Sequence, residues 1–171
     1  MTTLQTERLL LRMFREEDLD AYASLCGDPE VVRFIGQPFT RVEAWRHLAM
    51  LLGHWQLRGF GLWAVEELAT GAMIGRIGFF QPEGWPGFEL GWMLVRAYWG
   101  RGLATEGARA ALEFAFTELR RPHVISLIRP ENRSSIRVAE KLGERLEGRS
   151  EVLGVEALVY GISRESWLLR V

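Results

Sequence analysis

The sequence predicts one mixed α/β domain with the element order βααβββαβαββ. Four observations support this fold class. Apolar runs of strand length alternate with longer segments that have helical spacing, and glycines stand at several of the boundaries between them. No linker, repeat or low-complexity tract divides the 171 residues, and 48% of them are apolar, enough for a sizeable core. We therefore expect residues 1–171 to form a single domain.

Short apolar runs bounded by glycine, proline or charged residues predict the strands of the sheet. These strands are expected at residues 9–14, 61–67, 73–80, 87–95, 124–128, 145–153 and 155–163. The second and third strands form a hairpin around residues 69–71, and the last two turn at Gly154.

Apolar residues at helical spacing predict four helices. They are expected at residues 15–26, 40–57, 101–118 and 132–142. Thr40 is a suitable N-cap whose capping box is completed by Glu43, and Gly143 ends the last helix. Residues 28–39 are expected to form a loop.

Composition excludes several classes of partner. A net charge of −1 gives no sign of a nucleic-acid partner. No apolar stretch is long enough to span a membrane, and the first residues lack the apolar core of a signal peptide. Cys26 is the single cysteine, which fits a reducing cytoplasm and rules out an intrachain disulfide. We expect a cytoplasmic protein.

No metal site is expected, because the single cysteine and three histidines lack metal-ligand spacing. His47 and His54 fall seven residues apart on one predicted helix, and we expect both to be partly exposed.

Residues 98–106, Tyr-Trp-Gly-Arg-Gly-Leu-Ala-Thr-Glu, lie between a predicted strand and a helix start. Glycines allow successive N–H groups to point to one place, and the helix N-terminus adds partial positive charge, so the loop suits a pyrophosphate. The Rossmann pattern fails because Thr105 replaces its third glycine, and no Walker Gly-Lys-Ser/Thr follows. Gly-x-Gly alone also fits a plain turn.

Four segments, in this order, resemble the GCN5-related N-acetyltransferase superfamily and, within it, the RimJ/RimL-like group of ribosomal-protein N-terminal acetyltransferases. The segments are residues 6–12, residues 28–31, residues 89–92 followed by 98–106, and residues 132–143. Two positions depart from the superfamily pattern. Ala97 replaces the Gln or Arg that usually opens the loop, and Ala139 replaces a tyrosine that many members use.

The resemblance implies a sheet splayed between its fourth and fifth strands, with acetyl-CoA as co-substrate. It implies that the loop from Gly100 through Arg101, Gly102, Leu103 and Ala104 to Thr105 holds the pyrophosphate. It also implies that the backbone of Met93, Leu94 and Val95 pairs with the pantetheine arm, that Asn132 bonds to that arm, and that Ser135 contacts the thiol end. A homodimer through the C-terminal strands would also follow.

Acyl transfer to an amine needs a neutral amine and a proton for the leaving thiolate. Glu89 is the candidate general base, directly or through water, because it shares a strand face with Gly91, which leaves room beside it. A surface carboxylate paired with an arginine is its alternative interpretation. Ser135 is the candidate proton donor, and its alternative is a first-turn serine bonded to backbone. Tyr98 and Tyr160 are other possible donors. Glu106 should point away from a phosphate.

The leading hypothesis is an N-acetyltransferase that transfers acetyl directly to a primary amine, with no covalent acyl-enzyme. The acceptor is left open among a protein or peptide N-terminus, a lysine side chain, a polyamine, an aminoglycoside and an amino acid. Asp28, Glu30 and Glu83 lie in loops where they would attract a cationic amine, and Trp85 is expected to be an exposed loop aromatic. A non-catalytic acyl-CoA-binding module and a nucleotide-binding domain are the alternatives.

Overall fold

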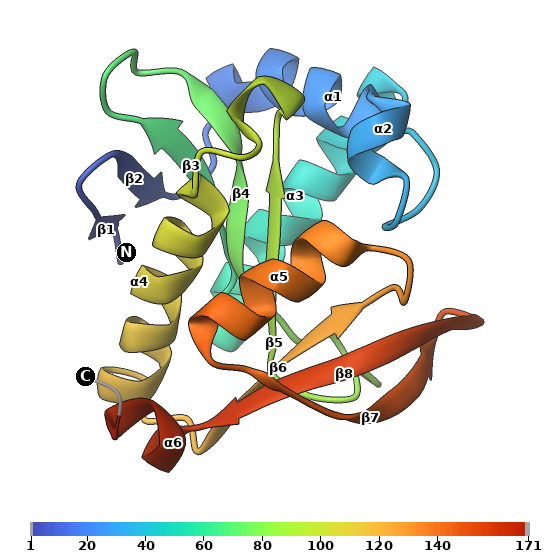
Figure 1. Ribbon diagram of the computed structural model, residues 1–171. Helices are drawn as coiled ribbons and strands as arrows, with labels where there is room; N and C mark the ends of the chain where they lie inside the picture. Colours follow the sequence, from blue (N-terminus) through green and yellow to red (C-terminus); the bar gives the residue numbers. More distant parts are fainter. Residues whose placement is uncertain (1, 170–171) are drawn as a thin grey trace.

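The protein forms one eight-stranded sheet flanked by helices (Figure 1). The computed structural model describes residues 2–169. The spatial strand order is β1-β2-β3-β4-β5-β6-β8-β7. The strands are β1 Leu4–Gln5, β2 Leu9–Arg12, β3 Leu62–Glu67, β4 Met73–Phe80, β5 Glu89–Leu94, β6 His123–Ile128, β7 Arg145–Val152 and β8 Val155–Ser163. Neighbouring strands are antiparallel except β5 and β6, which are parallel.

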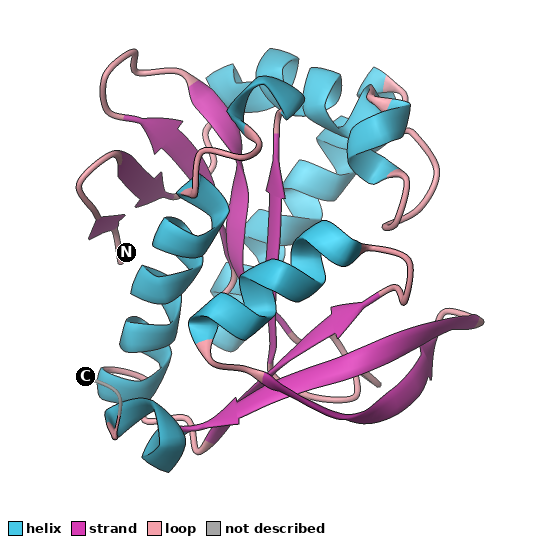
Figure 2. Ribbon diagram, in the orientation of Figure 1, coloured by secondary structure: helices cyan, strands magenta, loops and turns pink. Residues whose placement is uncertain are grey.

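Helices cover both faces of this sheet. They are α1 Leu19–Gly27, α2 Pro29–Val32, α3 Arg41–Arg58, α4 Leu103–Thr117, α5 Arg133–Leu142 and α6 Arg164–Leu168, with 3-10 turns at Glu16–Asp18 and Arg96–Tyr98. In Figure 2, α5 crosses in front of the sheet and α3 lies behind it. One apolar cluster joins α4 to the sheet, and a second joins α1 and α3 to its opposite face. No helix among residues 2–169 is long and apolar enough to cross a membrane.

The sheet opens between β5 and β6. Their single registered pair is Glu89 with Ile125, near the start of β5, and the two strands diverge beyond it (Figure 1). The hydroxyl of Ser126 donates to the Leu90 carbonyl at 3.0 Å and holds the point of divergence together. The expected splay between the fourth and fifth predicted strands is therefore confirmed.

Most predicted elements are present with ends shifted by a few residues. Thr40 and Glu43 form the expected capping box of α3, and Gly143 ends α5 in a left-handed conformation. Three short elements were not predicted: β1, α2 within the expected loop, and α6. Each has five residues or fewer, which is too short for a periodic pattern to be recognised.

Candidate active site

A cavity of about 770 Å³ extends from the opening between β5 and β6. Three predicted site residues line it: Glu89 from β5, and Asn132 and Ser135 from the start of α5. The rest of its wall is largely apolar and aromatic, and includes Phe34, Phe39, Phe80, Trp85 and Trp92. Residues far apart in sequence thus meet in one concave, mainly apolar space, the usual form of a small-molecule site.

The side chain of Glu89 is hydrogen-bonded to the indole of Trp85, a contact that was not predicted from the sequence. Trp85 Nε1 donates to Glu89 Oε2 at 2.7 Å, and the Trp85 ring packs edge-on against Phe80. Trp85 is half-buried, so the expectation of an exposed loop aromatic is wrong. A Cβ built at Gly91 would meet nothing within 4 Å, so the space beside Glu89 is open.

Burial sets the charge of Glu89. It raises the pKa of the Glu89 carboxyl to about 7, although the Trp85 hydrogen bond and the nearby charge of Arg76 partly offset it. The carboxyl can therefore gain and lose a proton near neutral pH, which is the property required of a general base.

The start of α5 presents Ser135 to the same cavity. The Asn132 side chain caps this helix by accepting from the Ser135 N–H at 3.2 Å, so Ser135 is not itself the cap. The Ser135 hydroxyl accepts from Trp92 Nε1 at 3.2 Å. This bond uses an oxygen lone pair and leaves the hydroxyl proton available to another acceptor.

The three residues predicted to pair with pantetheine lie at the end of β5. The N–H of Val95 donates to the Ile74 carbonyl at 2.9 Å, toward β4. Backbone polar groups alternate sides along a strand, so those of Met93 and Val95 face β4, whereas those of Leu94 face the opening. By the same alternation, the backbone polar groups of Trp92 also face the opening, although Trp92 was not predicted to pair with pantetheine.

The loop before α4 has the geometry of an anion-binding turn. Gly100 and Gly102 adopt φ values of 72° and 78°, which other residues rarely tolerate. The first helical bond of α4 runs from the Glu106 N–H to the Gly102 carbonyl. Within residues 2–169, the N–H groups of residues 100–105 donate to no backbone carbonyl. These donors at a helix N-terminus fit a pyrophosphate.

Side chains of this loop are fixed by the rest of the domain. Trp99 Nε1 donates to the Leu94 carbonyl at 2.7 Å, which occupies that acceptor at the β5 edge. Arg101 pairs with Glu67 at 3.0 Å, and the Tyr98 hydroxyl also points to Glu67, at 3.4 Å. With these side chains engaged, the loop would bind a phosphate through its backbone N–H groups. The Tyr98 hydroxyl points away from the cavity.

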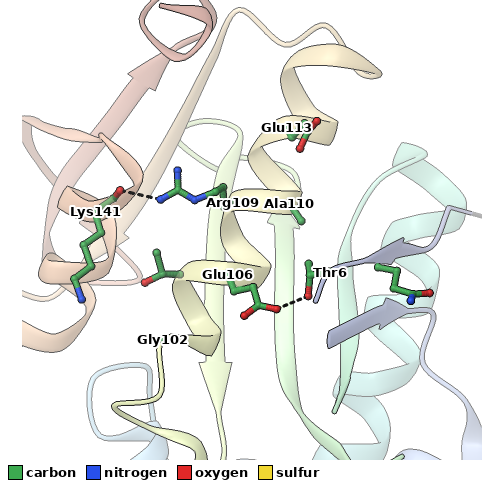
Figure 3. A pocket seen from close by; sticks show the side chains of 9 residues that line it. Thr6, Gly102, Glu106, Arg109, Ala110, Glu113 and Lys141 are labelled. Carbon is green, nitrogen blue, oxygen red and sulfur yellow. Dashed lines mark hydrogen bonds between the residues drawn. The ribbon is translucent and has the colours of Figure 1, made fainter. Parts of the chain in front are cut away.

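The carboxylate of Glu106 is bound by residues near the start of the chain. Its carboxylate accepts a hydrogen bond from Thr6 Oγ1 at 2.6 Å (Figure 3). It also forms an ion pair with Arg8. A hollow of about 560 Å³ runs along α4 there. Toward α5, Arg109 donates to the Lys141 carbonyl at 3.3 Å, and both residues line this hollow together with Gly102 (Figure 3).

Three loop carboxylates that were expected to attract an amine are engaged elsewhere. Asp28 caps α2 and pairs with Arg96, Glu83 pairs with Arg58, and Glu30 lies 4.0 Å from a neighbouring arginine. None of the three lines the cavity, where Glu89 is the one acidic residue among the described lining residues.

The expectation of two partly exposed histidines is wrong for His54. Its ring is buried, with Nδ1 donating to the Phe60 carbonyl and Nε2 accepting from the Gln81 N–H. His47 is half-buried, lines the cavity and shares a 2.8 Å hydrogen bond with the Tyr22 hydroxyl. Burial lowers the pKa of His47 to about 4, so its ring is neutral at physiological pH.

Comparison with known proteins agrees with this geometry. Residues 8–145 match the family model of the acetyltransferase (GNAT) domain. The chain is 32% identical to the uncharacterized N-acetyltransferase p20 of Bacillus licheniformis, over 86% of this chain and 85% of that protein. It is 31% identical to the FsC-acetyl coenzyme A-N(2)-transacetylase of Aspergillus fumigatus, over 97% of this chain and 78% of that protein.

A solved structure is similar over nearly the whole length. The crystal structure of an acetyltransferase from Agrobacterium tumefaciens superposes with a TM-score of 0.87 at 34% identity, covering 95% of this chain and 94% of that one. The splayed sheet and glycine turn define an acyl-CoA-dependent acyltransferase. The chain belongs to the GNAT family of acetyltransferases, and it is an N-acetyltransferase that uses acetyl-CoA as co-substrate.

Proposed function

We propose that this enzyme transfers acetyl directly from acetyl-CoA to a primary amine, with Glu89 as general base and Ser135 as proton donor. The observation that carries the proposal is that both side chains line one cavity at the splay of the sheet. The pyrophosphate would bind the N–H groups of residues 100–105, and the pantetheine arm would follow the free edge of β5 toward Ser135.

In this reaction the acceptor nitrogen loses two protons and the leaving thiolate gains one. Glu89, as the carboxylate, takes the first proton from the acceptor ammonium directly or through one water and passes it to solvent, and the neutral amine attacks the thioester carbon. The nitrogen of the resulting tetrahedral adduct gives its second proton to Glu89, the carbon–sulfur bond breaks, and the thiolate takes a proton from the Ser135 hydroxyl. The proton held by Glu89 then restores the hydroxyl through solvent. Holding both substrates side by side supplies much of the rate.

The acceptor is a primary amine, either a peptide N-terminus or a small-molecule amine. Membership of the RimJ/RimL-like group, a cytoplasmic location and a homodimer remain predictions from sequence. The Aspergillus relative is named an FsC-acetyl coenzyme A-N(2)-transacetylase, which agrees with transfer of acetyl from acetyl-CoA to a nitrogen.

The test is release of free CoA, followed by a thiol assay, with peptides, polyamines, aminoglycosides and amino acids as acceptors. With the best acceptor, Glu89→Gln should lower kcat by about 10²–10⁴-fold, the usual contribution of a general base. Ser135→Ala should also lower kcat. Acetyl-CoA binding, measured by calorimetry, should stay near the wild-type value in both variants.

Glu83→Gln is the matched control, since Glu83 is a fully exposed carboxylate on the loop that carries Trp85. It should keep wild-type turnover. Full activity of Glu89→Gln at every pH would remove Glu89 from the mechanism. Binding of acetyl-CoA without CoA release for any amine in the panel would contradict the proposed acceptor class.

A further inference from the structure

Arg76 is a charged residue of the cavity that the catalytic proposal does not use. It lies on β4 and lines the cavity together with Glu89 and His47. Within residues 2–169 its guanidinium forms no ion pair, and its buried Nε has no hydrogen-bond partner. By contrast, the guanidinium of the buried Arg12 forms ion pairs with Asp18 and Glu66.

An unpaired guanidinium in a largely apolar cavity is costly, because partly desolvated charges normally require a partner. His47 cannot act as an anionic partner, and its ring is neutral at physiological pH. Leu62, Phe39 and Phe80 also line the cavity and supply no charge. The cavity therefore presents a cation that an anionic group of a bound molecule would complete.

The sheet places this cation on the same face as the candidate base. In the register of β4 with β5, Arg76 is opposite Met93 and Phe80 is opposite Glu89. Directly opposed residues share a face, so Arg76 and Glu89 stand on one face, about 13 Å apart along the strands at their backbones. Between them lies Gly91, where a Cβ would meet no other atom within 4 Å.

The charges of the cavity also disfavour a polycation. Its described lining holds one carboxylate, Glu89, and two guanidiniums, those of Arg76 and Arg129. A polyamine or an aminoglycoside would place further ammonium groups near these arginines, with one acidic partner available. A molecule with an amine at one end and an anion at the other matches the charges better.

We propose that Arg76 binds a carboxylate of the acceptor, so that the substrate is an amino acid or short peptide whose amine reaches Glu89 while its carboxylate reaches Arg76. A planar guanidinium suits a planar carboxylate, since it donates two parallel hydrogen bonds. This proposal rests on the proposed function for the amine end of the acceptor. The anion site itself rests on Arg76 alone.

The test compares α-amino acids and dipeptides with their own carboxamides, which carry the same amine without the anion. Wild-type enzyme should prefer the carboxylates in kcat/KM for CoA release. Arg76→Gln should raise KM for the carboxylates about 10–100-fold, as expected for hydrogen bonds to a charged group. It should leave KM for the carboxamides and KM for acetyl-CoA near wild-type values. The comparison is made well above the pKa of Glu89, because loss of the Arg76 charge raises that pKa and would slow turnover of every acceptor at neutral pH.

Arg46→Gln is the matched control, because Arg46 is exposed on α3, outside the cavity. It should keep the wild-type preference. Arg76→Gln should also keep or raise the unfolding temperature, since it removes a charge that has no partner. A clear fall in unfolding temperature would instead show that Arg76 supports the fold, and would overturn the proposal.

Two further outcomes separate the anion site from the base. Calorimetric binding of the carboxylates in the presence of CoA should weaken in Arg76→Gln even where no turnover occurs. If Glu89→Gln stays active while Arg76→Gln loses the preference, the base assignment fails and the anion site stands. Equal use of carboxylates and carboxamides by the wild type, or preference for polyamines, would overturn the anion site.

Discussion

At Glu89, burial and neighbouring groups act on the carboxyl in opposite directions. Burial raises its pKa, while the indole of Trp85 and the charge of Arg76 favour the ionised form. The result, about 7, leaves a large fraction of Glu89 ionised at neutral pH yet keeps it basic enough to take a proton. This balance depends on contacts that a sequence read one segment at a time does not reveal.

We expect kcat/KM to rise with pH through about 7, because a general base must lose its proton before it can act. The measurement is the pH profile of CoA release at subsaturating acceptor. Glu89→Gln should lose this inflection and keep only the later rise caused by deprotonation of the amine itself. A wild-type profile without an inflection near neutrality would contradict the role of Glu89.

Single residues of the site differ in how far the sequence could find them. Glu89 and Ser135 were predicted because they belong to segments that resemble a known family. Arg76 was not assigned to the site, and Trp85 was expected only as an exposed aromatic near the acceptor, without its contact to Glu89, since nothing in their local sequence indicates the cavity. Their roles depend on the pairing of β4 with β5 and on the path of the loop between them.

Among the elements, the turn into α4 depends most on backbone conformation. Gly102 forms the N-cap position of α4 in a left-handed conformation and has no side-chain hydrogen bond. Its conformation and that of Gly100 were predictable, because glycines between a strand and a helix indicate such a turn. The interaction of Glu106 with Thr6 and Arg8 was not, since it spans about a hundred residues of sequence.

Gly102→Val should weaken acetyl-CoA binding about tenfold or more, because a β-branched residue strains the left-handed turn by about 1–2 kcal/mol and displaces the N–H donors. Calorimetric titration with acetyl-CoA measures this effect. Gly71→Val is the control, since Gly71 has a similar φ of 70° in an exposed turn with open space around it. Equal binding by both variants would place the pyrophosphate elsewhere.

The junction of β2, β3 and α1 contains a buried ion pair. Arg12 donates two hydrogen bonds to Asp18, each 2.8 Å long, and a third to Glu66. Burial alone would raise the pKa of Asp18, but hydrogen bonds from Arg12 and from the Arg15 backbone more than offset it and hold the pKa below its usual value. The pair therefore stabilises the fold while Asp18 is ionised.

Asp18→Asn should lower the free energy of unfolding by about 3 kcal/mol, because Arg12 would lose its charged partner. The wild-type contribution should be complete above pH ~4, the ordinary pKa of an aspartate, and fade as pH falls toward the lowered pKa. Urea unfolding at neutral and acidic pH measures both effects. Glu156→Gln, which breaks an exposed pair with Arg149, should cost less than about 1 kcal/mol. Similar losses in the two variants would contradict this assignment.

At the scale of the whole molecule, the splay of the sheet creates the cavity in which the proposed acetyl transfer would take place. One registered pair holds β5 to β6, and beyond it the strands separate to form the cavity. The fold class, the strand order along the chain and the splay were predicted from sequence. The two arginines of the cavity, Arg76 and Arg129, were not predicted, because the cavity forms where β4, β5, β6 and the α2–α3 loop meet.

The most direct test of the proposed function is to follow an isotopically labelled acetyl group from acetyl-CoA by mass spectrometry of the acceptor and of the intact enzyme. We expect the label on the acceptor nitrogen, one acetyl for each CoA released, and an unlabelled enzyme. Label held on the enzyme, or CoA released without an acetylated acceptor, would contradict direct transfer to an amine.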